Sequence, residues 1–185
     1  MKYYQVFSKV YQGAAQKMCR DCQDFIEKSS KILDLGCGSG IVAKAFKDFF
    51  QAEVMGVDIE DKRIVNIPFQ MIDGKNLPFS KNSFDTVLLS YVLHHSQDPT
   101  TLLNEAKRVS KKIIIYEDLP EGFSSKLICN IHRISFAKFF RNLNSASFKS
   151  EKEWEKIFRE LGLNIIFKKK INNFPVKKEL FVLGT

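Results

Sequence analysis

The residues most able to do chemistry in this chain lie in one short stretch, where an acid precedes three alternating glycines. Asp34 lies in the apolar run 31–35, and Gly36, Gly38 and Gly40 follow before an amphipathic segment begins. Glycine allows the backbone to turn with positive φ and to come close to a ligand. The first turn of a helix offers unpaired N–H groups. A buried strand that runs through such a turn into a helix therefore predicts a cofactor-binding loop.

The spacing of the glycines argues against a dinucleotide. The dinucleotide fingerprint G-x-G-x-x-G/A requires a small third residue for close packing. Counted from Gly36, that position holds Ile41; counted from Gly38, it holds Ala43, but the turn then starts two residues late. The phosphate-binding pattern also fails, because no Gly-Lys-Ser/Thr follows. The acid Asp34 would oppose a pyrophosphate, whereas it suits a ligand that carries positive charge.

Two further acids follow predicted strands later in the chain. A second strand is predicted to end at Asp58, which Ile59 follows, and a third is predicted to end just before Asp73 and Gly74. A carboxylate is the natural acceptor for hydrogen bonds from two vicinal hydroxyl groups. Three acids therefore stand at or just after the ends of predicted strands.

Taken in order, these motifs resemble those of the class I S-adenosylmethionine-dependent methyltransferases, in the small-molecule, type 11-like branch. The resemblance extends over residues 31–118, where a fourth and a fifth strand are predicted at 86–90 and 113–117. It implies that the cofactor is S-adenosyl-L-methionine, which carries a sulfonium and an ammonium group and no phosphate. That cofactor fits an acid at the end of the first strand.

The resemblance also implies roles for individual residues. In the family, the acid at Asp58 accepts hydrogen bonds from both ribose hydroxyls, and the apolar residue at Ile59 packs on adenine. The position of Asp73 resembles the one that accepts a hydrogen bond from the adenine amino group. The cofactor-binding residues expected are Asp34, Gly36, Cys37, Gly38, Asp58, Ile59, Asp73, Gly74 and Ser90.

Two adjacent histidines are the candidate catalytic residues. His94 and His95 follow the predicted fourth strand, at the carboxyl edge of a parallel sheet, where ligands bind in open α/β folds. A neutral imidazole near pH 7 can accept a proton. Methyl transfer needs a base only when the nucleophile must lose a proton, so packing or capping is the competing interpretation. Glu117 or Asp118 could also face the substrate, and the sequence does not choose between them.

The alternation of predicted strands and helices, followed by a terminal strand pair, predicts a single α/β domain over residues 1–185. The resemblance implies a Rossmann-like, doubly wound seven-stranded sheet, mostly parallel with an antiparallel last strand. Its expected parts are a helical cover (1–30, with a helix over 3–28), a cofactor-binding core (31–118), a substrate lid (119–149), and a last helix and strand pair (150–185). Core packing is the competing interpretation of the apolar segment 119–149.

The charge and the cysteine content limit which ligands, metal sites and cellular locations the sequence allows. The net charge is +8, and residues 119–185 hold 13 basic and 6 acidic side chains. Such asymmetry can mark a surface for nucleic acid, anionic lipid or an acidic substrate, or simply a solvated surface. Cys19 and Cys22 form a lone C-x-x-C, too few ligands for a structural zinc site, so no metal is expected. No apolar run could span a bilayer and no signal peptide begins the chain, so we expect a cytoplasmic protein.

The sequence thus predicts an S-adenosylmethionine-dependent methyltransferase that acts on a small-molecule acceptor. The alternatives are an RNA methyltransferase that uses the basic C-terminal face, and a cofactor-binding protein without turnover. A nicotinamide-dependent oxidoreductase is a more distant possibility. Ser90-Tyr91-Val92-Leu93 stands where enzymes that methylate planar amino groups have Asn/Asp-Pro-Pro-Tyr/Phe, which argues against base amino methylation. The sequence sets neither the acceptor nor the oligomeric state.

Overall fold

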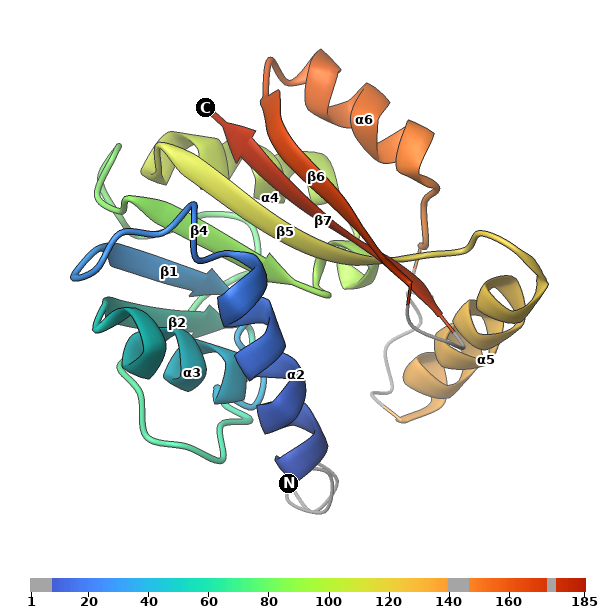
Figure 1. The fold of residues 1–185 in the computed structure, drawn as a ribbon, viewed down its shortest axis with the longest axis horizontal. Coiled ribbons are helices and arrows are strands. Elements are labelled where there is room, and N and C mark those ends of the chain that lie inside the picture. The colour runs from blue at the N-terminus through green and yellow to red at the C-terminus, as the bar shows by residue number, and fades with distance from the viewer. Residues whose placement is uncertain (1–7, 140–146, 173–175) are drawn as a thin grey trace.

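The computed structural model describes residues 8–139, 147–172 and 176–185 (Figure 1). The helices are α2 (Ser8–Asp21), α3 (Ile41–Phe50), α4 (Pro99–Val109), α5 (Phe123–Phe139) and α6 (Glu151–Glu160), with a short 3-10 helix at Leu93–His95. The strands are β1 (Lys31–Leu35), β2 (Glu53–Asp58), β3 (Phe69–Met71), β4 (Thr86–Ser90), β5 (Lys112–Leu119), β6 (Asn164–Asn172) and β7 (Lys177–Gly184).

The seven strands form one sheet in the order β3-β2-β1-β4-β5-β7-β6. The strands from β3 to β5 pair in parallel, and β7 inserts antiparallel between β5 and β6. The predicted mostly parallel sheet with an antiparallel last strand is confirmed. Because β1, β2, β3 and β4 run in the same direction, their carboxyl ends meet at one edge of the sheet.

Helices cover both faces of the sheet, and two apolar cores result. Helices α2 and α3 pack on one face and α4 and α6 on the other (Figure 1). Strand β1 shows why both cores form: Ile32 belongs to the first and Leu33 to the second, and both are fully buried. Continuous apolar runs are typical of strands covered on both faces. This packing fixes the edge where the candidate site lies.

The first helix is shorter than predicted. The prediction of a helix over 3–28 is wrong at its C-terminal end, because α2 stops at Asp21 and turns follow, with Phe25 N–H donating to the Cys22 carbonyl at 2.9 Å. Ser29 then takes a left-handed φ of 61°, which leads the chain into β1. Residues 3–7 of that prediction, 140–146 of the predicted lid and 174–175 of the predicted last strand lie outside the described residues.

The C-x-x-C cysteines are part of the core. Cys19 and Cys22 are fully buried, and the Cys22 Sγ lies 3.1 Å from the hydroxyl of Tyr116. Burial is the main reason that the pKa of each thiol rises to about 12. Thiols with such pKa values are poor nucleophiles at neutral pH. Both thiols are therefore core residues poorly suited to redox chemistry, and Cys22 contacts β5 through Tyr116.

Candidate functional site

The glycine loop between β1 and α3 has the conformation that its sequence predicts. Gly36, Gly38 and Gly40 have φ values of 81°, 49° and 75°, a region that side-chain-bearing residues rarely adopt. A Cβ atom at Gly36 would lie 2.3 Å from the Cγ2 atom of Val92, which is too close for any larger residue. The loop thus brings bare backbone close to the segment that follows β4.

Cys37 occupies the loop with its side chain turned inward. Its thiol is 7% exposed, and a Cβ atom at Gly56 would meet its Sγ at 2.9 Å. Burial and the charge of Asp34 raise the pKa of the thiol. Cys37 N–H donates to the Val57 carbonyl at 3.1 Å. Cys37 therefore anchors the loop to β2, and its thiol stays protonated.

Asp34 is the most unusual side chain of the site. It is 1% exposed, and neither carboxylate oxygen has a hydrogen-bond partner among the described residues. Burial raises the pKa of Asp34 to about 7, and the charge of Asp58 adds to this rise. The nearby Ala43 amide lowers the pKa, although it does not reach hydrogen-bonding geometry. A buried carboxylate without partners costs free energy. The energetic penalty would be relieved by a ligand that brings a positive charge.

Asp58 connects the glycine loop to the end of β2. Its Oδ2 atom accepts a hydrogen bond from Gly38 N–H at 2.8 Å, and its Oδ1 atom accepts one from Ile59 N–H at 2.7 Å. A carboxylate has about four acceptor positions, so capacity for further donors remains. The two backbone bonds hold the carboxylate at the carboxyl edge of the sheet, in the position expected for a hydroxyl-binding acid.

An apolar surface lies beside Asp58. Ile59 is 52% exposed, and a Cβ atom at Gly74 would lie 3.0 Å from its Cγ2 atom. Met71 pairs with Asp58 across β2 and β3 and is 65% exposed. Exposed large apolar side chains at a strand end suit the face of a planar ring. Met71 was not among the predicted site residues, although its position two residues before Asp73, at the end of a predicted strand, is a sequence signal for it.

Asp73 fixes the turn after β3. Its Oδ1 accepts hydrogen bonds from the backbone amides of Lys75 and Asn76, both at 2.8 Å, and its Oδ2 accepts one from the side-chain amide of Asn76 at 3.3 Å. These bonds lower the pKa of Asp73, so the carboxylate is ionised at neutral pH. Three of about four acceptor positions are thus used, and one is left for a ligand donor.

The end of β4 turns sharply toward the glycine loop. Ser90 lies with its hydroxyl 3.9 Å from the sulfur of Met18 on α2, and Tyr91 takes a left-handed φ of 58°. A tyrosine in this conformation is uncommon, and strained backbone of this kind clusters at functional sites. Lys178 Nζ lies 4.4 Å from the centre of the Tyr91 ring. No sequence pattern predicts this conformation.

His94 forms a buried pair with Glu117. His94 Nδ1 and Glu117 Oε2 are 2.5 Å apart, and Glu117 Oε1 accepts a hydrogen bond from Leu93 N–H at 2.9 Å. Their side chains are 1% and 0% exposed. Burial lowers the pKa of His94, but the charge and hydrogen bond of Glu117 raise it by more, so the net direction is upward. The sequence did not choose between Glu117 and Asp118: in the structure Glu117 contacts His94, whereas Asp118 forms an ion pair with Lys178 at 3.6 Å.

The segment before α6 covers His94. Ser147 N–H donates to the His94 carbonyl at 2.7 Å, and the Phe148 ring stacks on the imidazole with centroids 4.5 Å apart. The His95 ring lies 4.1 Å from that of His94 and is only partly buried. The two histidines thus differ, since His94 is enclosed and held by an acid while His95 is accessible. No described group of three His, Cys, Asp or Glu side chains could hold a metal ion.

The structure therefore brings the predicted residues together at one edge of the sheet, around the ends of β1 to β4. Residues 33–113 match the family model of a methyltransferase domain. That segment is thus similar to a class I methyltransferase domain of the type 11-like branch. The matched range includes every predicted site residue of this domain and ends before Glu117 and α5.

Relatives of the methyltransferase domain differ in how much of their length this chain spans. The uncharacterized protein MJ1123 of Methanocaldococcus jannaschii is 32% identical over 139 residues, which are 72% of this chain and 64% of that protein. The demethylmenaquinone methyltransferase of Thermotoga maritima is 34% identical over 101 residues, 49% of this chain and 44% of that enzyme. The chain therefore spans less than two thirds of either relative.

The fold extends beyond the matched range. The crystal structure of PH0226 from Pyrococcus horikoshii has a TM-score of 0.76 and covers 100% of this chain and 98% of that protein, at 21% identity. At that identity the likeness concerns the fold. The last helix and the β6–β7 pair, which the family model does not reach, are therefore part of the same architecture.

Proposed function

We propose that this protein is an S-adenosylmethionine-dependent methyltransferase that transfers a methyl group to a small-molecule acceptor. The observation that carries the proposal is the Asp34 carboxylate near the end of β1, buried without a hydrogen-bond partner among the described residues. A phosphate-bearing cofactor would add negative charge beside it, whereas S-adenosylmethionine brings two positive groups. The orphaned acid therefore supports this cofactor over a nicotinamide dinucleotide.

The chain offers partners for each part of that cofactor. Asp34 and the loop 36–40 would hold the cationic amino-acid end, Asp58 the ribose hydroxyls, and Asp73 the adenine amino group. Ile59 would contribute its apolar surface. When bound, the cofactor supplies a methyl group already activated by its sulfonium, so the protein has to orient the acceptor and exclude water.

The two histidines suit different roles in the movement of a proton. Glu117 fixes the His94 ring through Nδ1, and the raised pKa of His94 reflects how Glu117 stabilises the protonated form of that ring. Because His94 is enclosed, we assign it the role of positioning the His95 ring that lies against it. His95, the more accessible ring, is the candidate for contact with the acceptor and for accepting the proton that the acceptor loses.

The ion pairs of the basic C-terminal region favour a small acceptor over RNA. Lys168 contacts Glu151 and Glu155 at 2.5 and 2.7 Å, and Lys169 contacts Asp21 at 2.8 Å. Because side chains alternate along β6, Lys169 points to the opposite face from Lys168. The lysine run is therefore divided between two faces and largely neutralised, whereas RNA binding requires free cations along one face.

The proposed location is the cytoplasm. All four cysteines are free, and free thiols are usual in that reducing compartment. Among the described residues, no helix has the length and apolar character to cross a bilayer. The Thermotoga maritima relative is named a demethylmenaquinone methyltransferase, and an acceptor that is not a macromolecule is consistent with the acceptor class proposed here.

Labelled S-adenosylmethionine tests the proposal directly. The protein is incubated with the methyl-labelled cofactor and fractionated cell extract, and Asp58→Ala serves as the matched variant with impaired cofactor binding. We expect label in a low-molecular-weight product with the wild type and none with the variant. Label in the RNA fraction would support the RNA alternative, and cofactor binding without transfer to any fraction would support a binding protein without turnover.

A further inference from the structure

Helix α5 exposes a row of large apolar side chains to solvent. Phe123 is 87% exposed, Leu127 51%, Ile131 50% and Ile134 64%. Successive spacings of four, four and three residues place them on one face of the helix. We call these four residues the α5 stripe.

The opposite side of α5 attaches the helix to the rest of the protein. Ser125 and Cys129 are 1% and 4% exposed, and the Ser125 hydroxyl accepts a hydrogen bond from Lys177 N–H at 3.0 Å. Figure 1 shows α5 at one end of the molecule, beyond the end of β5 and outside the two helical layers. The stripe is therefore a surface feature and not part of either core.

The stripe differs from the other exposed apolar residues. Ile59 and Met71 adjoin the proposed cofactor site, Ile165 and Ile166 are neighbours on β6, and Val10 and Phe49 stand alone on α2 and α3. Single exposed apolar residues are normal in globular proteins, whereas a contiguous patch indicates an interaction surface. Four on one helical face form such a patch.

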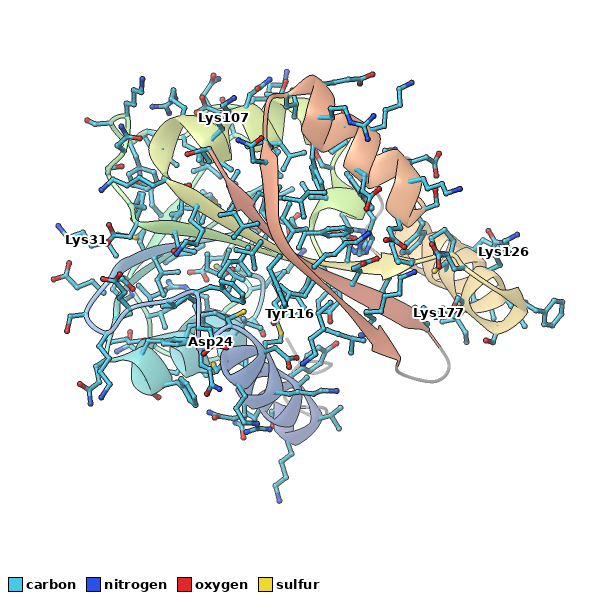
Figure 2. All side chains as sticks on the ribbon, turned by 45° about the horizontal axis from the view of Figure 1, so that its top comes forward. Asp24, Lys31, Lys107, Tyr116, Lys126 and Lys177 are labelled. Carbon is cyan, nitrogen blue, oxygen red and sulfur yellow. The ribbon has the colours of Figure 1, made fainter. Side chains whose placement is uncertain are left out.

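The charge of the helix indicates what the surface fits. Residues 123–139 contain Lys126, Arg133 and Lys138 and no acidic residue. Lys126 is exposed, as is Lys177 at the start of the neighbouring strand, and Figure 2 shows both at this end of the molecule. A helix that combines Phe, Leu and Ile with lysine and arginine is typical of segments that lie in the interface of an anionic membrane.

We propose that α5 binds the surface of an anionic lipid membrane, with the α5 stripe inserted at the acyl boundary and Lys126 among the headgroups. The helix lies in the plane of the interface and does not span the bilayer, because its 17 residues include three basic ones. The inference rests on the stripe and the charge alone, so it holds whether or not the protein transfers methyl groups.

Vesicle sedimentation of the full chain tests this proposal. Wild-type protein is mixed with vesicles of phosphatidylcholine alone or of phosphatidylcholine with phosphatidylglycerol. The test variant is the double substitution Leu127→Ser and Ile131→Ser. The matched control is Val10→Ser, which removes an exposed apolar side chain from α2. Because all three positions are exposed, the variants should fold, and circular dichroism checks this.

We expect the wild type and Val10→Ser to bind anionic vesicles at least about tenfold more tightly than neutral ones, and the double variant to lose at least about tenfold in affinity. Added salt should weaken wild-type binding. Equal binding to both vesicles, equal loss in Val10→Ser, or no sedimentation of the wild type would overturn the proposal. A wild-type dimer that the double variant converts to a monomer, without vesicle binding, would assign the stripe to self-association and overturn it as well.

Discussion

Replacement of Asp34 by asparagine should abolish a pH dependence of cofactor binding. The pKa of Asp34 is about 7, because the carboxyl is buried and lies near the charge of Asp58. A cationic cofactor binds the ionised form, which makes up about one tenth of the protein at about pH 6 and about three quarters at about pH 7.5. The affinity of the wild type should therefore rise by about eightfold between these two values.

Calorimetric titration with S-adenosylmethionine at both pH values measures this effect. The cofactor's own amino group titrates in the same range, but it does so equally with the wild type and with Asp34→Asn, so the difference between the proteins isolates Asp34. Buffers with different ionisation enthalpies should show proton release on binding to the wild type near pH 6. If the asparagine variant retains the same increase in affinity, or if the wild type shows none, Asp34 is not the cation-binding acid.

Asp34 should also make the unfolding free energy of the cofactor-free protein depend on pH. The native pKa of Asp34 is above the unfolded value, so the native state holds this proton more tightly. Proton binding to Asp34 therefore contributes up to about 4 kcal/mol to the free energy of unfolding. This contribution is fully present below about pH 4 and is lost as the pH rises through about 7. Denaturant unfolding of Asp34→Asn should show a smaller decrease of the unfolding free energy over this range than that of the wild type.

Three further substitutions test the local geometry. Gly36→Ala should destabilise the protein by about 3 kcal/mol, because Gly36 has a φ of 81° and the new Cβ atom would lie 2.3 Å from Val92 Cγ2. Gly13→Ala is the control: Gly13 lies in α2 with open space around it, so this change should stabilise the protein by about 0.5–1 kcal/mol. Thermal denaturation measures both effects. Glu117→Gln should lower the pKa of His94, visible in a proton NMR titration, because burial then acts without the opposing charge; an unchanged pKa would contradict the pairing. Ser150→Ala removes the capping box of α6 and should cost about 1 kcal/mol in chemical denaturation; a neutral effect would contradict the cap.

The placement of the proposed cofactor-binding residues could be predicted because they lie close together in sequence or at strand ends. The buried run of β1 followed by glycines specifies a strand, a turn and a helix, and each later acid directly follows an apolar run. Since the carboxyl ends of parallel strands meet at one edge, the order of the motifs was enough to group Asp34, Asp58 and Asp73. The structure places all three at that edge.

The acceptor side could not be predicted in the same way, because it depends on long-range pairing. Glu117 and His94 are 23 residues apart, and their contact depends on β4 lying next to β5. Side chains alternate along a strand, so a difference of one residue decides whether Glu117 or Asp118 meets the histidine. The left-handed Tyr91 and the end of α2 at Asp21 likewise depend on tertiary contacts and not on local propensity.

The central claim is that Asp58 and the glycine loop form a site for S-adenosylmethionine. Calorimetric titration of the wild type and of Asp58→Ala with this cofactor tests it most directly, with NAD as the comparison ligand. We predict one-to-one binding by the wild type, no heat with NAD, and about hundredfold weaker binding by the variant, since two charge-assisted hydrogen bonds to ribose are lost. Absence of binding to the wild type, or wild-type affinity in a folded Asp58→Ala variant, would contradict the claim.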